Sequence, residues 1–117
     1  MGSSAFGDYG EELAVFYLKE QGYKIIETNY VNKIGEIDII ARDGDVLCFI
    51  EVKARQGLYL GHPLEAVSIF KQKKLRRVAQ WYIAQKQIRD MDLRFDVVGV
   101  LVEDQHYPKI ELIKDAF

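Results

Sequence analysis

Alternating apolar and polar positions in the middle of the chain predict two adjacent β-strands. The apolar face consists of Ile37, Ile39 and Ala41 in the first strand and Val46, Cys48, Ile50, Val52 and Ala54 in the second. Because side chains alternate along a strand, the opposite faces carry Asp38 in the first strand and Glu51 and Lys53 in the second. Both runs are too apolar for a surface hairpin, so we expect central strands that are covered on both faces.

The turn between these strands decides how their polar faces meet. A two-residue loop at residues 43–44 places Asp38 diagonal to Glu51, whereas a loop at residues 44–45 places Asp38 directly opposite Glu51. The two registers differ by an even number of residues, so either one puts Asp38, Glu51 and Lys53 on one face. A three-residue loop would break this arrangement unless a bulge restored the register.

Two segments with helical periodicity flank the predicted strands. The first runs over about residues 4–21 and ends at Gly22, a residue type that commonly terminates helices. Its apolar stripe consists of Leu13, Tyr17 and Leu18, with Ala14 and Phe16 near them. The second runs over residues 69–86, after a short turn at residues 63–67 and an N-cap at Ser68. Its buried stripe consists of Leu75, Val78, Ala79, Tyr82 and Ile83.

Three further segments are expected to be strands. Residues 23–30, with Ile25 and Ile26 in the core, form an antiparallel meander with the central pair. Residues 93–102 follow the second helix, and a strand–helix–strand crossover implies that they run parallel to the third strand. Residues 110–114 form a last short strand. The order of helix, three strands, helix and one or two strands predicts an α/β fold with a mixed central sheet flanked by helices.

Length and composition indicate one domain with one core. The chain has 117 residues, of which 49% are apolar, and residues 5–117 are expected to form the domain. Residues 1–4 are expected to be disordered or derived from a tag. No apolar run approaches the length needed to span a bilayer and no signal-peptide pattern opens the chain, so we expect a cytoplasmic protein without a membrane partner.

The single cysteine and the two histidines do not suggest a metal site of the zinc type. Cys48 lies in a strand that should be buried, and we expect it to be a small core residue in a reducing compartment. The histidines are His62 and His106, which fall in predicted loops. A zinc site made of the usual ligands is therefore not expected.

Asp38, Glu51 and Lys53 are the first candidates for chemistry. Carboxylate oxygens are hard ligands, and a pair of them suits Mg²⁺, which otherwise keeps its waters or takes phosphate oxygens. A lysine beside such an ion can orient an attacking water. The alternative is a cross-strand salt bridge on a solvated sheet face. The apolar flanking runs weigh against that alternative, because charges at covered positions are costly unless they are paired or bound to an ion.

Glu11 and Glu12 in the first helix are further acidic candidates. One of them can reach the proposed metal from the helix that packs on the sheet, but they point about 100° apart, so at most one serves. The alternative is that both complement the helix dipole and favour solubility.

The second helix carries a basic block in a chain whose net charge is −2. Its cationic residues are Lys71, Lys73, Lys74, Arg76 and Arg77, with no acid among them. The block is either a solvated helix face or a track for phosphates. Trp81 and Tyr82 beside it are expected to be packing residues rather than platforms on which bases stack.

Several short motifs give the chain a family resemblance. Gly10-Glu11-Glu12-Leu13, Gly22-Tyr23, Gly35-Glu36-Ile37-Asp38 and Ile50-Glu51-Val52-Lys53 resemble the PD-(D/E)xK nuclease superfamily, and archaeal Holliday-junction resolvases within it. With Lys71-Gln72 and Arg94-Phe95-Asp96-Val97-Val98 added, the chain resembles the YraN-like family of uncharacterised bacterial proteins over nearly its whole length. One departure is Ile37, where the superfamily motif has a proline that the chemistry does not require.

The resemblance implies a restriction-endonuclease-like fold and a role for each matching residue. Asp38, Glu51 and the backbone carbonyl of Val52 would hold Mg²⁺ or Mn²⁺, with Glu11 joining the site. Lys53 would position the water or steady the phosphate. The residues expected to contact nucleic acid are Lys71, Gln72, Lys73, Lys74 and Arg77.

The leading hypothesis is therefore a metal-dependent endonuclease that acts on structured or branched DNA. One alternative is a nucleic-acid-binding module of the same fold with little or no cleavage activity. Another is a structural or protein-interaction domain whose carboxylates are salt-bridged.

A homodimer would match two-fold DNA structures. Its candidate contacts are the edge strands 93–102 or 110–114 and the loop at residues 57–62, which contains Tyr59 and Leu60. The alternative is a monomer whose edge is guarded by Pro108, Lys109 and Lys114.

Overall fold

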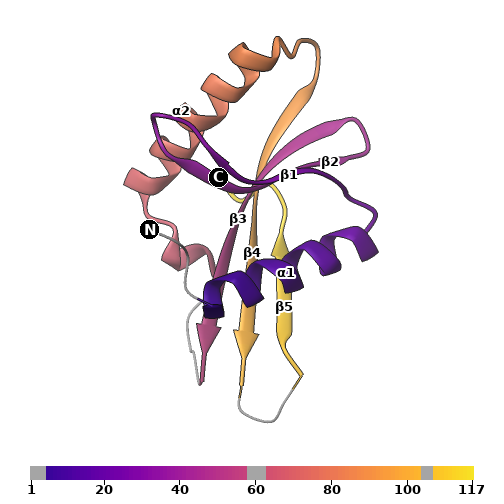
Figure 1. The fold of residues 1–117 in the computed structure, drawn as a ribbon, viewed down its shortest axis with the longest axis vertical. Helices are drawn as coiled ribbons and strands as arrows, with labels where there is room; N and C mark the ends of the chain where they lie inside the picture. Colours follow the sequence, from indigo (N-terminus) through magenta and orange to yellow (C-terminus); the bar gives the residue numbers. More distant parts are fainter. Residues whose placement is uncertain (1–4, 58–62, 104–106) are drawn as a thin grey trace.

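The computed structural model describes residues 5–57, 63–103 and 107–117 and contains one five-stranded sheet with two α-helices (Figure 1). The elements are α1 (Ala5–Glu20), β1 (Lys24–Val31), β2 (Glu36–Asp43), β3 (Val46–Gln56), the short 3-10 helix η1 (Pro63–Ala66), α2 (Ile69–Lys86), β4 (Asp92–Val102) and β5 (Lys109–Ile113). The predictions for residues 1–4, Tyr59, Leu60, His62 and His106 fall outside the described residues.

The sheet is mixed, with the strand order β1-β2-β3-β4-β5. All neighbours are antiparallel except β3 and β4, which run parallel on either side of the α2 crossover. The predicted meander and the predicted parallel crossover are both confirmed. Of the two strands considered for the edge, residues 110–114 fall in β5, which takes the edge position and pairs with β4.

The β2–β3 hairpin fixes the register of the central strands. Asp43 pairs with Val46, which corresponds to the predicted loop at residues 44–45. The β2–β3 ladder ends at the pair Ile39–Ile50, whereas β3 continues beside β4 to its own end. Figure 1 shows β1 and β2 curling away from the second half of β3 toward α2. The sheet is therefore forked between β2 and β3.

Two cores fill the two faces of the sheet, one under each helix. The α2 core contains the buried residues Tyr30, Ile37, Ile40, Leu47, Phe49, Val67, Leu75, Val78, Ala79, Tyr82, Phe95 and Val97. The α1 core contains Ala14, Leu18, Tyr23, Ile39, Ala41, Cys48, Ile50, Val98 and Val100. The predicted apolar face of β3 is confirmed, since Val46, Val52 and Ala54 also pack against the α1 core.

Ile37 departs from the predicted face of β2. It packs in the α2 core, whereas Ile39 and Ala41 pack in the α1 core. The cause is the curl of the β1–β2 hairpin, whose tip is bound to α2. Asn32 donates to the Val78 carbonyl at 3.4 Å there, which brings this end of β2 against the helix.

Phe16 and Ile26 also depart from the predicted cores. Phe16 is 64% exposed, because α1 buries the line of Gly10, Ala14 and Leu18, which are spaced four residues apart. Ile26 is 42% exposed, because neighbouring residues of a strand point to opposite faces and Ile25 packs against the α1 core.

The helix ends follow the sequence closely. Ser68 caps α2, with its hydroxyl oxygen accepting a hydrogen bond from the Lys71 amide at 3.1 Å. Gly22 follows α1 with φ +95°, a backbone conformation that favours glycine. In the described part of the chain, neither helix combines the length and the apolar composition needed to cross a membrane.

Cys48 is a core residue, as predicted. Its thiol is fully buried in the α1 core, and burial raises its pKa to about 12. It is therefore an unreactive thiol in the folded protein.

Candidate carboxylate–lysine cleft

A cavity of about 480 Å³ opens at the fork between β2 and β3. It is lined by Phe6, Gly7 and Glu11 of α1, Glu36 and Asp38 of β2, residues 51–55 of β3, and Lys71, Lys74 and Leu75 of α2. Helices that cover opposite faces of the sheet thus both contribute to this cavity, hereafter the cleft. Asp38, Glu51 and Lys53 line it together, as the predicted register requires.

Asp38 holds the two strands together where their ladder ends. Its Oδ2 atom accepts a hydrogen bond from the Val52 amide at 2.8 Å. The side chain thereby accepts a hydrogen bond from a β3 amide that lies beyond the end of the β2–β3 backbone ladder. This contact fixes the Asp38 carboxylate beside Glu51 and explains how an acidic residue is accommodated in an apolar strand.

Glu51 is the most strongly paired group of the cleft. It is only 6% exposed and forms ion pairs with two lysines. The Nζ atom of Lys53 lies 3.4 Å from Glu51 Oε2, and the Nζ atom of Lys71 contacts the same oxygen. Two ammonium groups from different elements therefore converge on one buried carboxylate oxygen.

The charges in the cleft are unevenly compensated. Burial, followed by repulsion from Glu51, raises the pKa of Asp38 to about 8, although the Val52 hydrogen bond opposes the shift. Burial also lowers the pKa of Lys53, and the neighbouring Lys71 adds to that effect. Burial alone would lower the pKa of Lys71, but its contact with Glu51 outweighs burial and raises it. Glu51 is thus neutralised by the protein, whereas Asp38 is not.

Of the two early glutamates, Glu11 is the one that lines the cleft. Gly10 makes this possible, because a Cβ atom there would lie 2.7 Å from the Cβ of Ala54 and would push α1 away from β3. Burial raises the pKa of Glu11, as does the negative charge nearby. Glu12 is exposed and does not line the cleft. This answers which glutamate faces the predicted site.

The donor set of the cleft fits a hard divalent cation, with a limit on the number of side-chain ligands. Asp38 and Glu51 offer carboxylate oxygens. Burial and repulsion from Glu51 both raise the pKa of Asp38, and a bound cation would stabilise its charged form. Within the described residues, no three His, Cys, Asp or Glu side chains form a group able to hold a metal ion. Glu11 therefore lies in the same cleft without forming such a group with the other two.

The residues predicted to contact nucleic acid are divided between the cleft and the surface of α2. Lys71 and Lys74 line the cleft, and Lys73 and Arg77 are exposed on the helix. Gln72 lies outside the cleft, where its side-chain amide donates to the Val67 carbonyl at 3.1 Å. Its contact with a phosphate stays a prediction.

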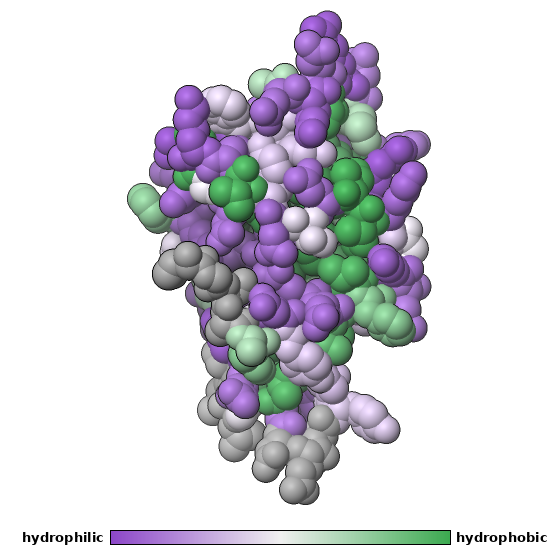
Figure 2. Space-filling model, in the orientation of Figure 1, coloured by the Kyte–Doolittle hydropathy of each residue, from purple (hydrophilic) through white to green (hydrophobic). Residues whose placement is uncertain are grey.

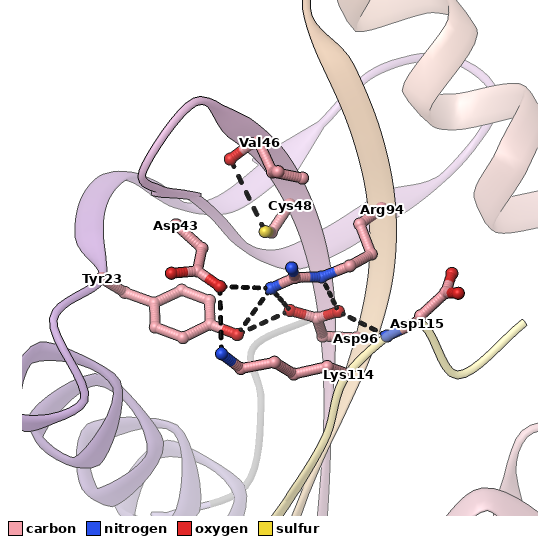
Figure 3. A network of polar contacts seen from close by, with 8 residues as sticks. All are labelled: Tyr23, Asp43, Val46, Cys48, Arg94, Asp96, Lys114 and Asp115. Carbon is pink, nitrogen blue, oxygen red and sulfur yellow. Dashed lines mark hydrogen bonds and ion pairs between the residues drawn. The ribbon is translucent and has the colours of Figure 1, made fainter.

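A second polar group was missed by the sequence analysis and lies apart from the cleft. Asp96 is fully buried and accepts hydrogen bonds from the Tyr23 hydroxyl at 2.8 Å, the Arg94 guanidinium at 2.8 Å and the Asp115 amide at 3.0 Å (Figure 3). Arg94 also bonds Asp43, which pairs with Lys114. The signal was present as an arginine and an aspartate two residues apart in the otherwise apolar β4. With its polar groups satisfied, this network is a structural clasp between the turn after α1, strands β2 and β4, and the C-terminal residues.

Comparison with known sequences places these features in a family context. Residues 10–100 match the model of "Uncharacterised protein family UPF0102". The chain is 50% identical to a UPF0102 protein of Acetivibrio thermocellus, a match covering 97% of this chain and 91% of the relative. It is 46% identical to a UPF0102 protein of Alkaliphilus metalliredigens, over 98% of this chain and 99% of the relative. The UPF0102 protein of Geotalea uraniireducens is 45% identical, over 98% and 91%.

Proposed function

We propose that this chain, which belongs to the UPF0102 family, is a metal-dependent nuclease of the restriction-endonuclease-like superfamily that hydrolyses phosphodiesters in structured or branched DNA. The observation that carries the proposal is the set of side chains in one open cleft. Asp38 and Glu51 approach from diverging strands, and Lys53 and Lys71 converge on Glu51. Paired carboxylates with adjacent ammonium groups are suited to phosphodiester hydrolysis.

Asp38, Glu51 and the Val52 carbonyl would hold Mg²⁺ or Mn²⁺, with Glu11 near enough to orient its waters. When bound, the ion lowers the pKa of a coordinated water and neutralises charge on the phosphate. The Val52 amide already restrains the Asp38 carboxylate, so little side-chain ordering would be needed on binding.

The lysines have separate roles in the proposal. Lys53 follows Glu51 on the same face of β3, where its ammonium can hold the attacking water or a phosphate oxygen. Its lowered pKa leaves a larger fraction of its amine neutral, and therefore able to accept a proton, than in an exposed lysine. Lys71 stabilises Glu51 from α2. In the presence of substrate, its ammonium can leave the Glu51 carboxylate and form an ion pair with the phosphate instead.

The test is a panel of labelled DNA forms (a four-way junction, a flap, a single strand and a linear duplex) incubated with Mg²⁺ or Mn²⁺. We expect metal-dependent cleavage by the wild-type protein and none by Asp38→Asn or Glu51→Gln, whose amides keep the side-chain shape. Full activity in both variants would rule out the cleft as the site. Calorimetric titration of the metal into each protein separates loss of the ion from loss of substrate binding.

A nucleic-acid-binding module with little or no cleavage is the second candidate. The observation that favours it is the double neutralisation of Glu51 by Lys53 and Lys71, which leaves less charge to attract a cation. The same panel distinguishes the two functions. Substrate binding without any cleavage, together with no heat of metal binding, would support the module.

A further inference from the structure

One exposed stripe of α2 combines aromatic and cationic side chains. Phe70, Lys74, Arg77 and Trp81 are spaced by four, three and four residues, which places them on one line along the helix. All four are exposed, Phe70 by 78% and Trp81 by 38%. We refer to these four residues as the α2 stripe. It points away from the buried side of the helix, which consists of Leu75, Val78, Ala79 and Tyr82.

The two aromatic residues of the α2 stripe are not explained by the core. Tyr82 is buried, whereas Trp81 is 38% exposed and its ring lies under the Lys33 ammonium, 4.9 Å from the ring centroid. Single exposed apolar residues are common. Here, however, an aromatic ring stands at each end of a line of cations.

The α2 stripe connects the cleft to a second hollow of the surface. Lys74 lines the cleft and also lies against the tip of the β1–β2 hairpin, near Gly35. Arg77 and Trp81 line a hollow of about 560 Å³ between α2 and Ile34 of the hairpin. A strand lying along the stripe would therefore pass from this hollow into the cleft without crossing an acidic surface of the helix.

The charge on this face suits a polyanion. Helix α2 contains no acidic residue, although the whole chain has a net charge of −2. Among the described residues, no carboxylate forms an ion pair with Lys73, Lys74 or Arg77. Figure 2 shows hydrophilic side chains over the part of the surface where α2 lies. The cations are thus available for phosphates.

We infer that the α2 stripe binds a single-stranded segment of nucleic acid, with unpaired bases stacked on Phe70 and Trp81 and phosphates held by Lys74 and Arg77. In a continuous duplex the base faces are already stacked on one another, so exposed aromatic rings add affinity only for unpaired bases. The two rings stand about 16 Å apart along the helix axis, so they serve two separate base positions. This inference rests on the proposed function and deepens it, because it makes a strand with an unpaired segment the preferred substrate.

The test measures binding without cleavage. The Asp38→Asn protein is titrated in EDTA with an oligo-dT of about 20 nucleotides, an oligo-U of the same length and a blunt duplex. Trp81 is the single tryptophan of the chain, so stacking of a base on it is expected to quench the intrinsic fluorescence. Quenching by oligo-dT or oligo-U supports the inference, and the stronger of the two identifies DNA or RNA.

Substitutions then assign the contacts by fluorescence anisotropy of labelled probes. We expect Phe70→Ala and Trp81→Ala each to weaken single-strand binding about 5- to 100-fold and to change duplex binding less than about 2-fold. The matched control is Phe16→Ala, which removes an exposed aromatic residue from α1 and should change neither. Circular dichroism of each variant verifies folding.

Three outcomes would overturn the inference: absence of quenching, an equal loss of single-strand and duplex affinity, or unchanged affinity in both aromatic variants. The proposed nuclease activity stands or falls separately. Metal-dependent cleavage of flap substrates that is insensitive to Phe70→Ala would refute single-strand binding by the α2 stripe but support the nuclease activity. Single-strand binding that depends on Phe70 and Trp81, without any cleavage, would support the α2 stripe and refute the nuclease activity.

Discussion

Asp38 combines a structural contact with an unfavourable charge. Its carboxylate accepts a hydrogen bond from the Val52 amide at the fork of the sheet. Burial and repulsion from Glu51 nevertheless raise its pKa to about 8. Between the unfolded pKa of about 3.9 and the folded value, the native state binds more protons than the unfolded state. The contribution of Asp38 to the stability of the metal-free protein therefore falls as the pH rises through this range.

Asp38→Asn is expected to remove that loss. The amide oxygen still accepts the Val52 hydrogen bond but carries no charge, so the variant should be more stable than wild type at about pH 8, by about 1–3 kcal/mol, and close to it at about pH 5. Urea unfolding at both values measures the difference. The control is Asp45→Asn in the exposed hairpin turn, which should leave the pH dependence unchanged. A stability difference between wild type and Asp38→Asn that is the same at pH 5 and pH 8 would contradict the argument.

Asp96 illustrates the opposite case, a buried charge that is fully satisfied. Replacing it with Asn leaves Arg94 without its main counter-charge, so we expect a loss of about 3–5 kcal/mol in the free energy of unfolding. Tyr23→Phe removes one hydrogen bond of the same network and should cost only about 1 kcal/mol. Denaturant unfolding compares the two variants. Equal losses would mean that the hydrogen bonds, rather than the charge pair, hold the clasp together.

At the scale of elements, α2 presents two polar surfaces in addition to its buried one. Lys71 and Lys74 line the cleft, and Lys73 and Arg77 are exposed on the helix. Helix α1 serves the cleft differently, because its close approach at Gly10 brings Glu11 to the edge of β3. The two helices thus meet at the cleft although they cover opposite faces of the sheet.

Reversing the charge of Lys73, Lys74 and Arg77 together, each to Glu, should weaken DNA binding and flatten its salt dependence. Fewer counterions are released when fewer phosphates are neutralised, so the slope of log K against log salt should fall by about 2–3 for duplex DNA. Binding isotherms over a series of salt concentrations give the slope. The matched control reverses Lys19, Lys24 and Arg89, which are exposed elsewhere. An unchanged slope would mean that the basic face of α2 is merely solvated.

At the scale of the whole molecule, the described part of the sheet has β5 at one edge, where it pairs with β4 alone. Strand β5 follows β4 at the edge and carries Lys109, which pairs with Glu103 at 3.2 Å. We propose that two copies associate through this edge and present two clefts to a two-fold DNA structure. Sedimentation at micromolar concentration, with and without junction DNA, should show a dimer. A monomer under both conditions would mean that each cleft acts alone.

The sequence alone determined much of this protein. Apolar alternation located the strands, the Ser68 cap set the start of α2, and the β2–β3 turn put Asp38, Glu51 and Lys53 on one face. These features are local, since they depend on residues a few positions apart or on a single tight turn. Interactions between residues that are close in the sequence can be inferred from the sequence directly.

The tertiary structure decided the features that depend on distant segments. The curl of the β1–β2 hairpin onto α2 moved Ile37 to the other core, and the fork in the sheet opened the cleft. The choice of Glu11 over Glu12 and the pairing of Lys71 with Glu51 followed from how the helices pack. Side chains more than a dozen residues apart meet only after the sheet has twisted and the helices have docked, and no local pattern encodes that geometry.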